Sequence, residues 1–152
     1  MNDKISKKFI LWLVLSILWT LFIFSFSMQT GEESAELSGG IVSRLIESFF
    51  GAGFAYASAL EHLIRKTAHF SEYFVLGVLL SATVRETRCK RQVLVPWFIG
   101  TLVAACDETI QLFSNGRSAQ VTDVMLDSAG VFCGCLIFSF LYNKVLNYIK
   151  SK

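Results

Sequence analysis

The sequence has few charged residues for its length. Of its 152 residues, 17% are Asp, Glu, Lys or Arg and 53% are hydrophobic, whereas an ordinary soluble domain has about 25% charged residues. The mean hydropathy is +0.53. This balance argues against a soluble domain and indicates a membrane protein.

Several kinds of functional site lack the residues they require. Glycine-rich phosphate loops are absent, and the basic residues flank apolar segments without interleaved aromatics, so we expect no nucleic-acid binding. Cys133 and Cys135 are two positions apart, which on a helix turns their side chains about 200° away from each other. We therefore expect neither a disulfide nor a zinc site built on cysteine.

Long apolar segments are what the sequence does contain. Residues 9–27 have no charge, no Gly and no Pro, and the run is long enough to cross about 30 Å of hydrocarbon. Residues 68–84, 92–113 and 124–142 are apolar apart from a few ionisable groups. We predict an all-α, multi-pass membrane protein with four transmembrane helices in one bundle and no separate soluble domain.

The connections between these segments predict an orientation. Ten of the 14 Lys and Arg residues lie in the N-terminal tail, the loop around residues 85–91 and the C-terminal tail. Arg44, Arg65, Lys66 and Arg117 lie on the opposite side. By the positive-inside rule, both termini are expected in the cytoplasm of a cell-membrane protein.

The long connection over residues 28–67 is then extracytoplasmic. In it, Leu37, Ile41, Leu45 and Phe49 repeat every four residues, which predicts an amphipathic helix on the outer leaflet. This helix either covers a site as a lid or packs on the bundle as an ordinary surface helix. Residues 54–60 form an apolar stretch too short to span the membrane.

Ionisable side chains interrupt the apolar segments, at a cost of at least about 2.5 to 3.5 kcal/mol for a charge at mid-bilayer. In the predicted topology they converge on one outer face, and Ser27 and Gln29, at the exit of the first span, reach the same level. On helices, Lys66, His69 and Tyr73 share a face, as do Asp107 with Gln111 and Asp123 with Asp127. The ionisable groups in or at the ends of the spans are His69, Glu72, Asp107, Glu108, Asp123 and Asp127, with Lys66 and Arg117 beside them.

The helix that begins near Asp123 continues to Gly130 and Gly134. This spacing places small residues on one face, which favours close approach of a neighbouring helix behind the polar groups.

Four blocks of residues carry a resemblance to a known family. They are Phe26-Ser27-Met28-Gln29, Arg65-Lys66-Thr67-Ala68-His69-Phe70-Ser71-Glu72-Tyr73, Asp107-Glu108-Thr109-Ile110-Gln111 with the downstream Gly116-Arg117, and Asp123 with the two glycines. In this order they resemble the VanZ-like family of small integral membrane proteins, over residues 9–140. The resemblance implies one VanZ-like membrane domain over residues 1–152 and a role at the bacterial cell envelope.

Some members of that family are associated with resistance to glycopeptide antibiotics such as teicoplanin, and the resemblance implies no established molecular activity. The partners we expect are membrane lipid and a candidate envelope component, either a cell-wall precursor or a glycopeptide.

The outer cluster has more carboxylates than basic groups. Protonated carboxylates, a bound cation or a protonated His69 would each resolve this imbalance. His69 with Asp107 or Asp127 has the groups for acid–base catalysis, and a histidine with two carboxylates has the groups for a divalent metal. Metal and cofactor are left open here. The candidate ligand-binding residues are Lys66, Glu72, Tyr73, Glu108, Gln111, Arg117, Asp123 and Gln29.

Three hypotheses for the function follow. The first is an envelope protein with an outward-facing binding pocket, the second a membrane-embedded hydrolase or transferase acting on a lipid-linked substrate, and the third a structural or partner-binding subunit. Ordinary structural roles compete for single residues: Arg117 and Asp123 as an exposed ion pair, Glu108 as a solvated rim group, and Tyr73 as an interface aromatic.

Overall fold

The computed structural model describes residues 6–28, 48–49, 57–113 and 120–151. Over these residues the chain is helical and contains no strand, which confirms the all-α prediction. The helices are α1 (Lys7–Ser27), α3 (Ala57–Arg85), α4 (Leu94–Leu112) and α5 (Val121–Lys150).

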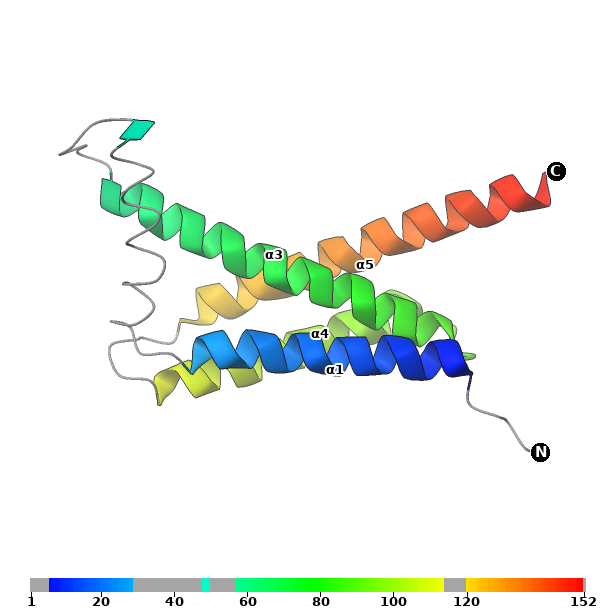
Figure 1. Cartoon of the computed structure of the whole chain (residues 1–152), viewed down its shortest axis with the longest axis horizontal. Helices are drawn as coiled ribbons and strands as arrows, with labels where there is room; N and C mark the ends of the chain where they lie inside the picture. The colour runs from blue at the N-terminus through cyan, green and yellow to red at the C-terminus, as the bar shows by residue number, and fades with distance from the viewer. Residues whose placement is uncertain (1–5, 29–47, 50–56, 114–119, 152) are drawn as a thin grey trace.

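The helices run alternately in opposite directions along one axis (Figure 1). One end of the bundle, from here the pocket end, carries the C-terminal ends of α1 and α4 and the N-terminal ends of α3 and α5. The other end, from here the termini end, carries the N-terminal end of α1, the C-terminal end of α5 and the connection from α3 to α4. Polar residues far apart in the sequence can therefore meet at the pocket end.

Three of the described helices are long and apolar enough to cross a membrane, namely α1, α5 and the part of α3 from His62 to Arg85. Helix α4 is not among them, because Asp107, Glu108 and Gln111 lower the hydropathy of its last turns. The bundle thus has three helices with the character of membrane spans, and a fourth span through α4 stays a prediction.

Helix α3 begins earlier than the sequence predicted. A span over 68–84 was expected, but the helix starts at Ala57, and the part of it that is apolar enough to cross a membrane starts at His62. Leu63 and Ile64 expose apolar side chains in these first turns, while His62, Arg65 and Lys66 line a pocket. These first turns of α3 are amphipathic. Because one of their faces is polar, a search for uniformly apolar segments does not detect them.

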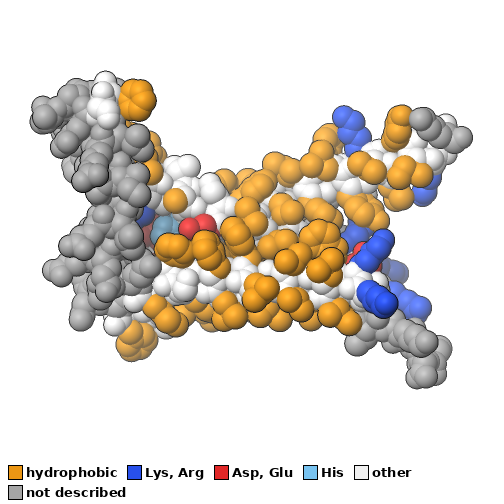
Figure 2. Space-filling view, viewed as in Figure 1, with side chains coloured by type: hydrophobic (Ala, Val, Ile, Leu, Met, Phe, Trp, Pro, Cys, Tyr) orange, Lys and Arg blue, Asp and Glu red, His pale blue; other side chains and the backbone are white. Residues whose placement is uncertain are grey.

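The outer surface of the bundle is largely apolar. Side chains such as Leu18 on α1, Phe98 on α4 and Phe140 on α5 are more than half exposed. Figure 2 shows hydrophobic side chains along most of the bundle, with Lys and Arg gathered mainly at the termini end of the face shown. An apolar surface of this size is unfavourable in contact with water and favourable in contact with the hydrocarbon of a lipid bilayer.

Helices α3 and α5 cross at very close range, and glycines allow it. A Cβ atom on Gly134 would lie 2.2 Å from the carbonyl oxygen of Phe74, and one on Gly130 would lie 2.6 Å from that of Phe70. From the other side, a Cβ on Gly77 would lie 2.3 Å from the carbonyl oxygen of Val131. The predicted small-residue face is therefore confirmed, and Gly77 on α3 completes it.

Paired polar groups attach the outer helices to this crossing. Ser16 of α1 and Thr83 of α3 share a buried hydrogen bond of 3.1 Å, and the Trp19 indole donates to the carbonyl of Glu72 at 2.9 Å. Between α4 and α5, Thr101 and Ser128 are hydrogen-bonded at 2.8 Å. The predicted amphipathic outer-loop helix lies outside the described residues except at Phe49, so the lid stays a prediction.

Candidate functional site

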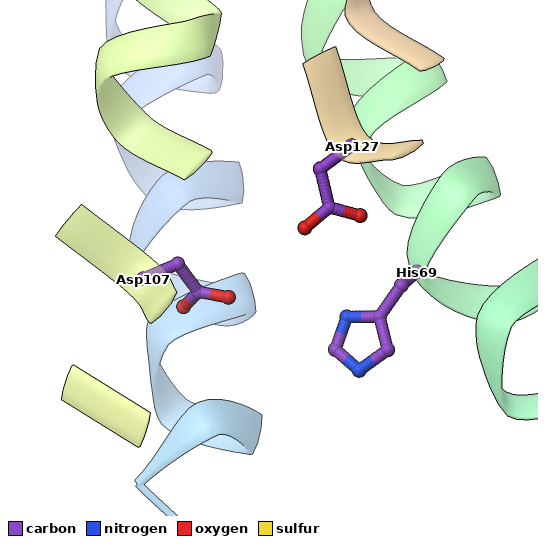
Figure 3. Close-up of side chains that lie close together, drawn as sticks. All are labelled: His69, Asp107 and Asp127. Atoms are coloured by element: carbon purple, nitrogen blue, oxygen red, sulfur yellow. The ribbon is translucent and has the colours of Figure 1, made fainter. Parts of the chain in front are cut away.

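Three side chains from three different helices meet near the pocket end. His69 of α3, Asp107 of α4 and Asp127 of α5 each place a potential ligand atom within 4.8 Å of the others. In Figure 3 both carboxylates point into the space that they share with the imidazole. Asp107 is fully buried, Asp127 is 3% exposed, and His69 is partly buried. We refer to these three residues as the His-Asp-Asp cluster.

The carboxylate of Asp107 is held firmly on one side only. Its Oδ2 accepts a hydrogen bond of 3.2 Å from Gln111, one helical turn further along α4. The Ser27 hydroxyl lies within hydrogen-bonding reach of Asp107 and at 3.5 Å from the Gln111 amide nitrogen. Ser27 therefore brings the exit of α1 into contact with the cluster, as the predicted topology required.

The other side of Asp107 has unused hydrogen-bonding capacity. Tyr73 is fully buried, and its hydroxyl lies close to the Asp107 carboxylate. Both the Tyr73 hydroxyl and Asp107 Oδ1 are without a hydrogen-bond partner. Most buried polar atoms in proteins are satisfied, so two adjacent exceptions point to a group that completes the site.

A fourth acid lies next to the cluster. Glu72 Oε2 is 3.8 Å from Nδ1 of His69, within ion-pair distance if the imidazole is protonated. Trp19 donates to the backbone carbonyl of Glu72, which anchors this turn of α3 against α1. Glu72 therefore adds negative charge beside the imidazole.

A pocket of about 150 Å³ adjoins the cluster at the pocket end. Lys66 and Asp123 form an ion pair of 2.7 Å in its wall, with each side chain 32% exposed. The pocket is lined by His62, Arg65, Lys66, His69, Glu108, Gln111, Gln120, Asp123, Leu126 and Asp127.

Two of the structural roles weighed from sequence are wrong. Tyr73 is not an interface aromatic, because it is fully buried against the cluster. Glu108 is not a solvated rim group, because it is 6% exposed and accepts a hydrogen bond of 2.6 Å from the backbone of Gln120.

The structure describes only some of the other predicted site residues. Asp123 pairs with Lys66, whereas the alternative pair with Arg117 involves a residue outside the described ranges, as does the candidate ligand Gln29. Among the remaining candidates, Glu72, Gln111, Lys66 and Asp123 lie in or beside the pocket and cluster.

Several pocket residues were not singled out as ligands from sequence. His62, Arg65, Gln120 and Leu126 line the pocket together with the predicted residues. A signal for the first two existed, since His62, Arg65, Lys66 and His69 follow helical spacing. It was missed because the helix was expected to begin at residue 68.

In the part of the site that the structure describes, the negative charge of the buried aspartates is not balanced by basic side chains. Asp107 and Asp127 have no Lys or Arg partner among the residues that the structure describes, where the ion pairs join Lys66 to Asp123 and His69 to Glu72. Buried carboxylates without a partner are costly. The arrangement suits a cationic occupant, a shared proton or acid–base chemistry, and it does not suit a bare anion.

Comparison with protein families gives a match over most of the chain. The VanZ/LLP1 family model matches residues 12–142, a range that contains the whole His-Asp-Asp cluster. No curated protein and no solved structure shows significant similarity to the chain.

Proposed function

The chain belongs to the VanZ/LLP1 family, and we propose that this membrane protein acts at the cell envelope, where its polar pocket faces outward and binds an envelope component. The observation that carries this proposal is the pocket itself. Its wall combines buried acids, a histidine and basic side chains at one end of an otherwise apolar bundle. Ionisable groups persist in such a position when they serve a ligand, a partner or water.

The distribution of basic residues supports an outward direction for the pocket. The termini end carries Lys7, Lys8, Arg85 and the basic loop around residues 88–91, which the positive-inside rule places in the cytoplasm. In the orientation that we propose, the pocket end faces the extracytoplasmic side, where wall precursors and glycopeptides are found.

Cysteine labelling of intact cells tests this orientation. In a background without the native cysteines, Ser114→Cys should react with a membrane-impermeant maleimide and Glu86→Cys should react only after the membrane is opened. The reverse pattern would place the pocket inside the cell and end the proposal of an envelope ligand.

Blocking the pocket tests ligand binding directly. Leu126 lines the pocket on α5, so Leu126→Trp should fill it. Leu136→Trp, on the exposed side of the same helix, is the matched control. We expect native mass spectrometry to find a lipid or wall precursor on the wild type and on the control, and not on Leu126→Trp. Equal retention by both variants would show that the pocket is not the binding site.

The finer proposal is a contribution to glycopeptide resistance. Cells that express the wild type should tolerate a higher concentration of teicoplanin than cells that express Leu126→Trp at the same level in the membrane. Equal inhibitory concentrations would remove teicoplanin resistance from the proposal without affecting the pocket.

A second candidate function is a membrane-embedded hydrolase or transferase acting on a lipid-linked envelope substrate. The observation in its favour is the proximity of His69 to two aspartates, which provides a base and groups to orient it. His69→Gln keeps hydrogen bonding and removes the base, so an enzyme should lose about 10² to 10⁴ in rate. A binding protein should keep most of its ligand. If both His69→Gln and Asp107→Asn preserve the envelope phenotype, the third hypothesis of a structural subunit is favoured.

A further inference from the structure

We propose that His69, Asp107 and Asp127 form a binding site for one divalent transition-metal ion, with Zn²⁺ and Mn²⁺ as the ions that the donor set suits best. The inference deepens the function proposed above, because it concerns the same site, but it depends neither on the envelope ligand nor on the orientation in the membrane.

The first argument is the donor set and its geometry. Three rigid helices present one imidazole nitrogen and two carboxylate oxygens, all within 4.8 Å of one another. Ligands bound to one metal at about 2.0 to 2.2 Å lie roughly 3 to 3.5 Å apart in tetrahedral geometry. The three groups therefore need to approach one another by at most about 1 to 2 Å to hold an ion.

The second argument is the unsatisfied oxygen of Asp107. This residue is fully buried, and its Oδ2 is held by Gln111 while its Oδ1 has no hydrogen-bond partner. Metal-binding carboxylates commonly have this division, in which one oxygen is fixed by a neighbouring side chain and the other is directed at the ion. The carboxylate points into the space shared with Asp127 and His69 (Figure 3).

The third argument is charge. Asp107 and Asp127 are buried next to each other, and Glu72 lies 3.8 Å from the imidazole. Of the basic side chains in the pocket wall, Lys66 is already paired with Asp123, and Arg65 lies 3.4 Å from the imidazole of His62. A divalent cation would neutralise the two aspartates of the cluster without any movement of the helices.

The composition of the site narrows the choice of ion. A histidine ligand disfavours Mg²⁺ and Ca²⁺, which prefer oxygen alone, and the absence of thiolate from the cluster disfavours Cu⁺. Three protein ligands leave at least one coordination position for water or an oxygen of a bound molecule. His69 and Asp127 also line the pocket, so a metal held by them would border it. The Tyr73 hydroxyl, which has no hydrogen-bond partner and lies close to Asp107, would be available to a water or ligand at that position.

Two other occupants would account for the same geometry. A proton shared between the aspartates would reduce their charge, and a cationic organic ligand would do the same from the pocket. Metal measurements distinguish these alternatives, because neither of them gives saturable metal binding.

The experiment uses the full chain without a polyhistidine tag, purified in detergent, treated with EDTA and dialysed. Titration with Co²⁺ as a spectroscopic probe should give d–d absorption bands that saturate at one ion per chain, and Zn²⁺ or Mn²⁺ should displace them. His69→Gln, Asp107→Asn and Asp127→Asn should each weaken Co²⁺ binding at least about 100-fold. Glu86→Gln is the matched control, since it removes an exposed carboxylate at the termini end and should leave the affinity unchanged.

The wild type alone can overturn the proposal. Absence of saturable binding of Co²⁺, Zn²⁺ and Mn²⁺ to the wild-type chain would do so, as would binding of Mg²⁺ or Ca²⁺ only. Equal loss of affinity in Glu86→Gln would show that the loss is not specific to the cluster and would also overturn it. Metal binding without any co-purified envelope component would retain this site and reject the proposed ligand. The opposite result would retain the ligand and reject the metal.

Discussion

The same pair of helices, α3 and α5, serves two opposite purposes along its length. At the crossing, Gly77, Gly130 and Gly134 bring the two backbones into direct contact and leave no room for a Cβ atom. Toward the pocket end, His69 and Asp127 extend from the same helices into a polar space with incomplete hydrogen bonding. The crossing is tightly packed, whereas the polar region leaves buried hydrogen-bonding groups without partners.

This contrast has a direct energetic consequence. In lipid, helices associate through close packing and hydrogen bonds rather than through exclusion of water, so the glycine crossing contributes stability. Buried carboxylates without partners lower stability. Substitutions in the two regions should therefore change the free energy of unfolding with opposite signs.

The largest effect is expected at the crossing. Gly134→Ala places a Cβ 2.2 Å from the Phe74 carbonyl oxygen, a backbone atom that cannot move without displacing α3. We expect a loss of about 3 kcal/mol in unfolding free energy, measured by denaturation in detergent. Ala129→Leu, at an exposed position one turn or so earlier on α5, is the control and should change it by less than about 0.5 kcal/mol. If Gly134→Ala were as stable as the control, the close crossing would be wrong.

A smaller effect of opposite sign is expected in the polar region. Asp107→Asn preserves the volume, can still accept from Gln111, and turns an amide toward the unpartnered Tyr73 hydroxyl. The metal-free protein should gain about 1 to 2 kcal/mol, because a buried charge is removed.

The same substitution should abolish the stabilisation that the wild type gains on addition of Zn²⁺ or Mn²⁺. A lower stability of the metal-free Asp107→Asn protein would mean that the carboxylate already has a partner that satisfies its charge.

The sequence was sufficient for the crossing and for much of the polar region, for one physical reason. Both depend on helical periodicity, which can be recognised in a single sequence. The spacing of Gly130 and Gly134 predicted close contact between helices. The position of the ionisable groups at the ends of the apolar segments predicted that these groups converge. Gly77 was not predicted, because it has no glycine partner at helical spacing within its own segment.

What could not be predicted depends on neighbouring helices. From the sequence alone, Tyr73 and Glu108 could lie either at the surface of the bundle or in its interior. The packing of α3 and α4 places both side chains in the interior. The start of α3 was misplaced because its first turns alternate polar pocket residues with exposed Leu63 and Ile64. Hydropathy alone averages these two faces together.

An intermediate effect is expected at a polar contact that is fully satisfied. Ser16 bonds Thr83 at 3.1 Å between α1 and α3, near the termini end. Ser16→Ala should cost about 1 kcal/mol, in the range measured for hydrogen bonds between membrane helices. Ser25→Ala is the control, since its hydroxyl is exposed and bonds only the carbonyl of Phe22 in its own helix. A stabilising Ser16→Ala would remove the distinction between satisfied and unsatisfied buried polar groups.

The smallest effect is expected for the ion pair in the pocket wall. Lys66 and Asp123 are close, at 2.7 Å, but each side chain is 32% exposed, so solvent screens their attraction. In a double-mutant cycle with Lys66→Met and Asp123→Asn, we expect a coupling free energy below about 1 kcal/mol, and lower still in high salt. A coupling above about 2 kcal/mol would mean that the pair is desolvated and that it stabilises the packing of α3 against α5. The pocket wall would then belong with the glycine crossing, as a part of the molecule that stabilises the bundle, and not with the polar region that we propose to hold a ligand.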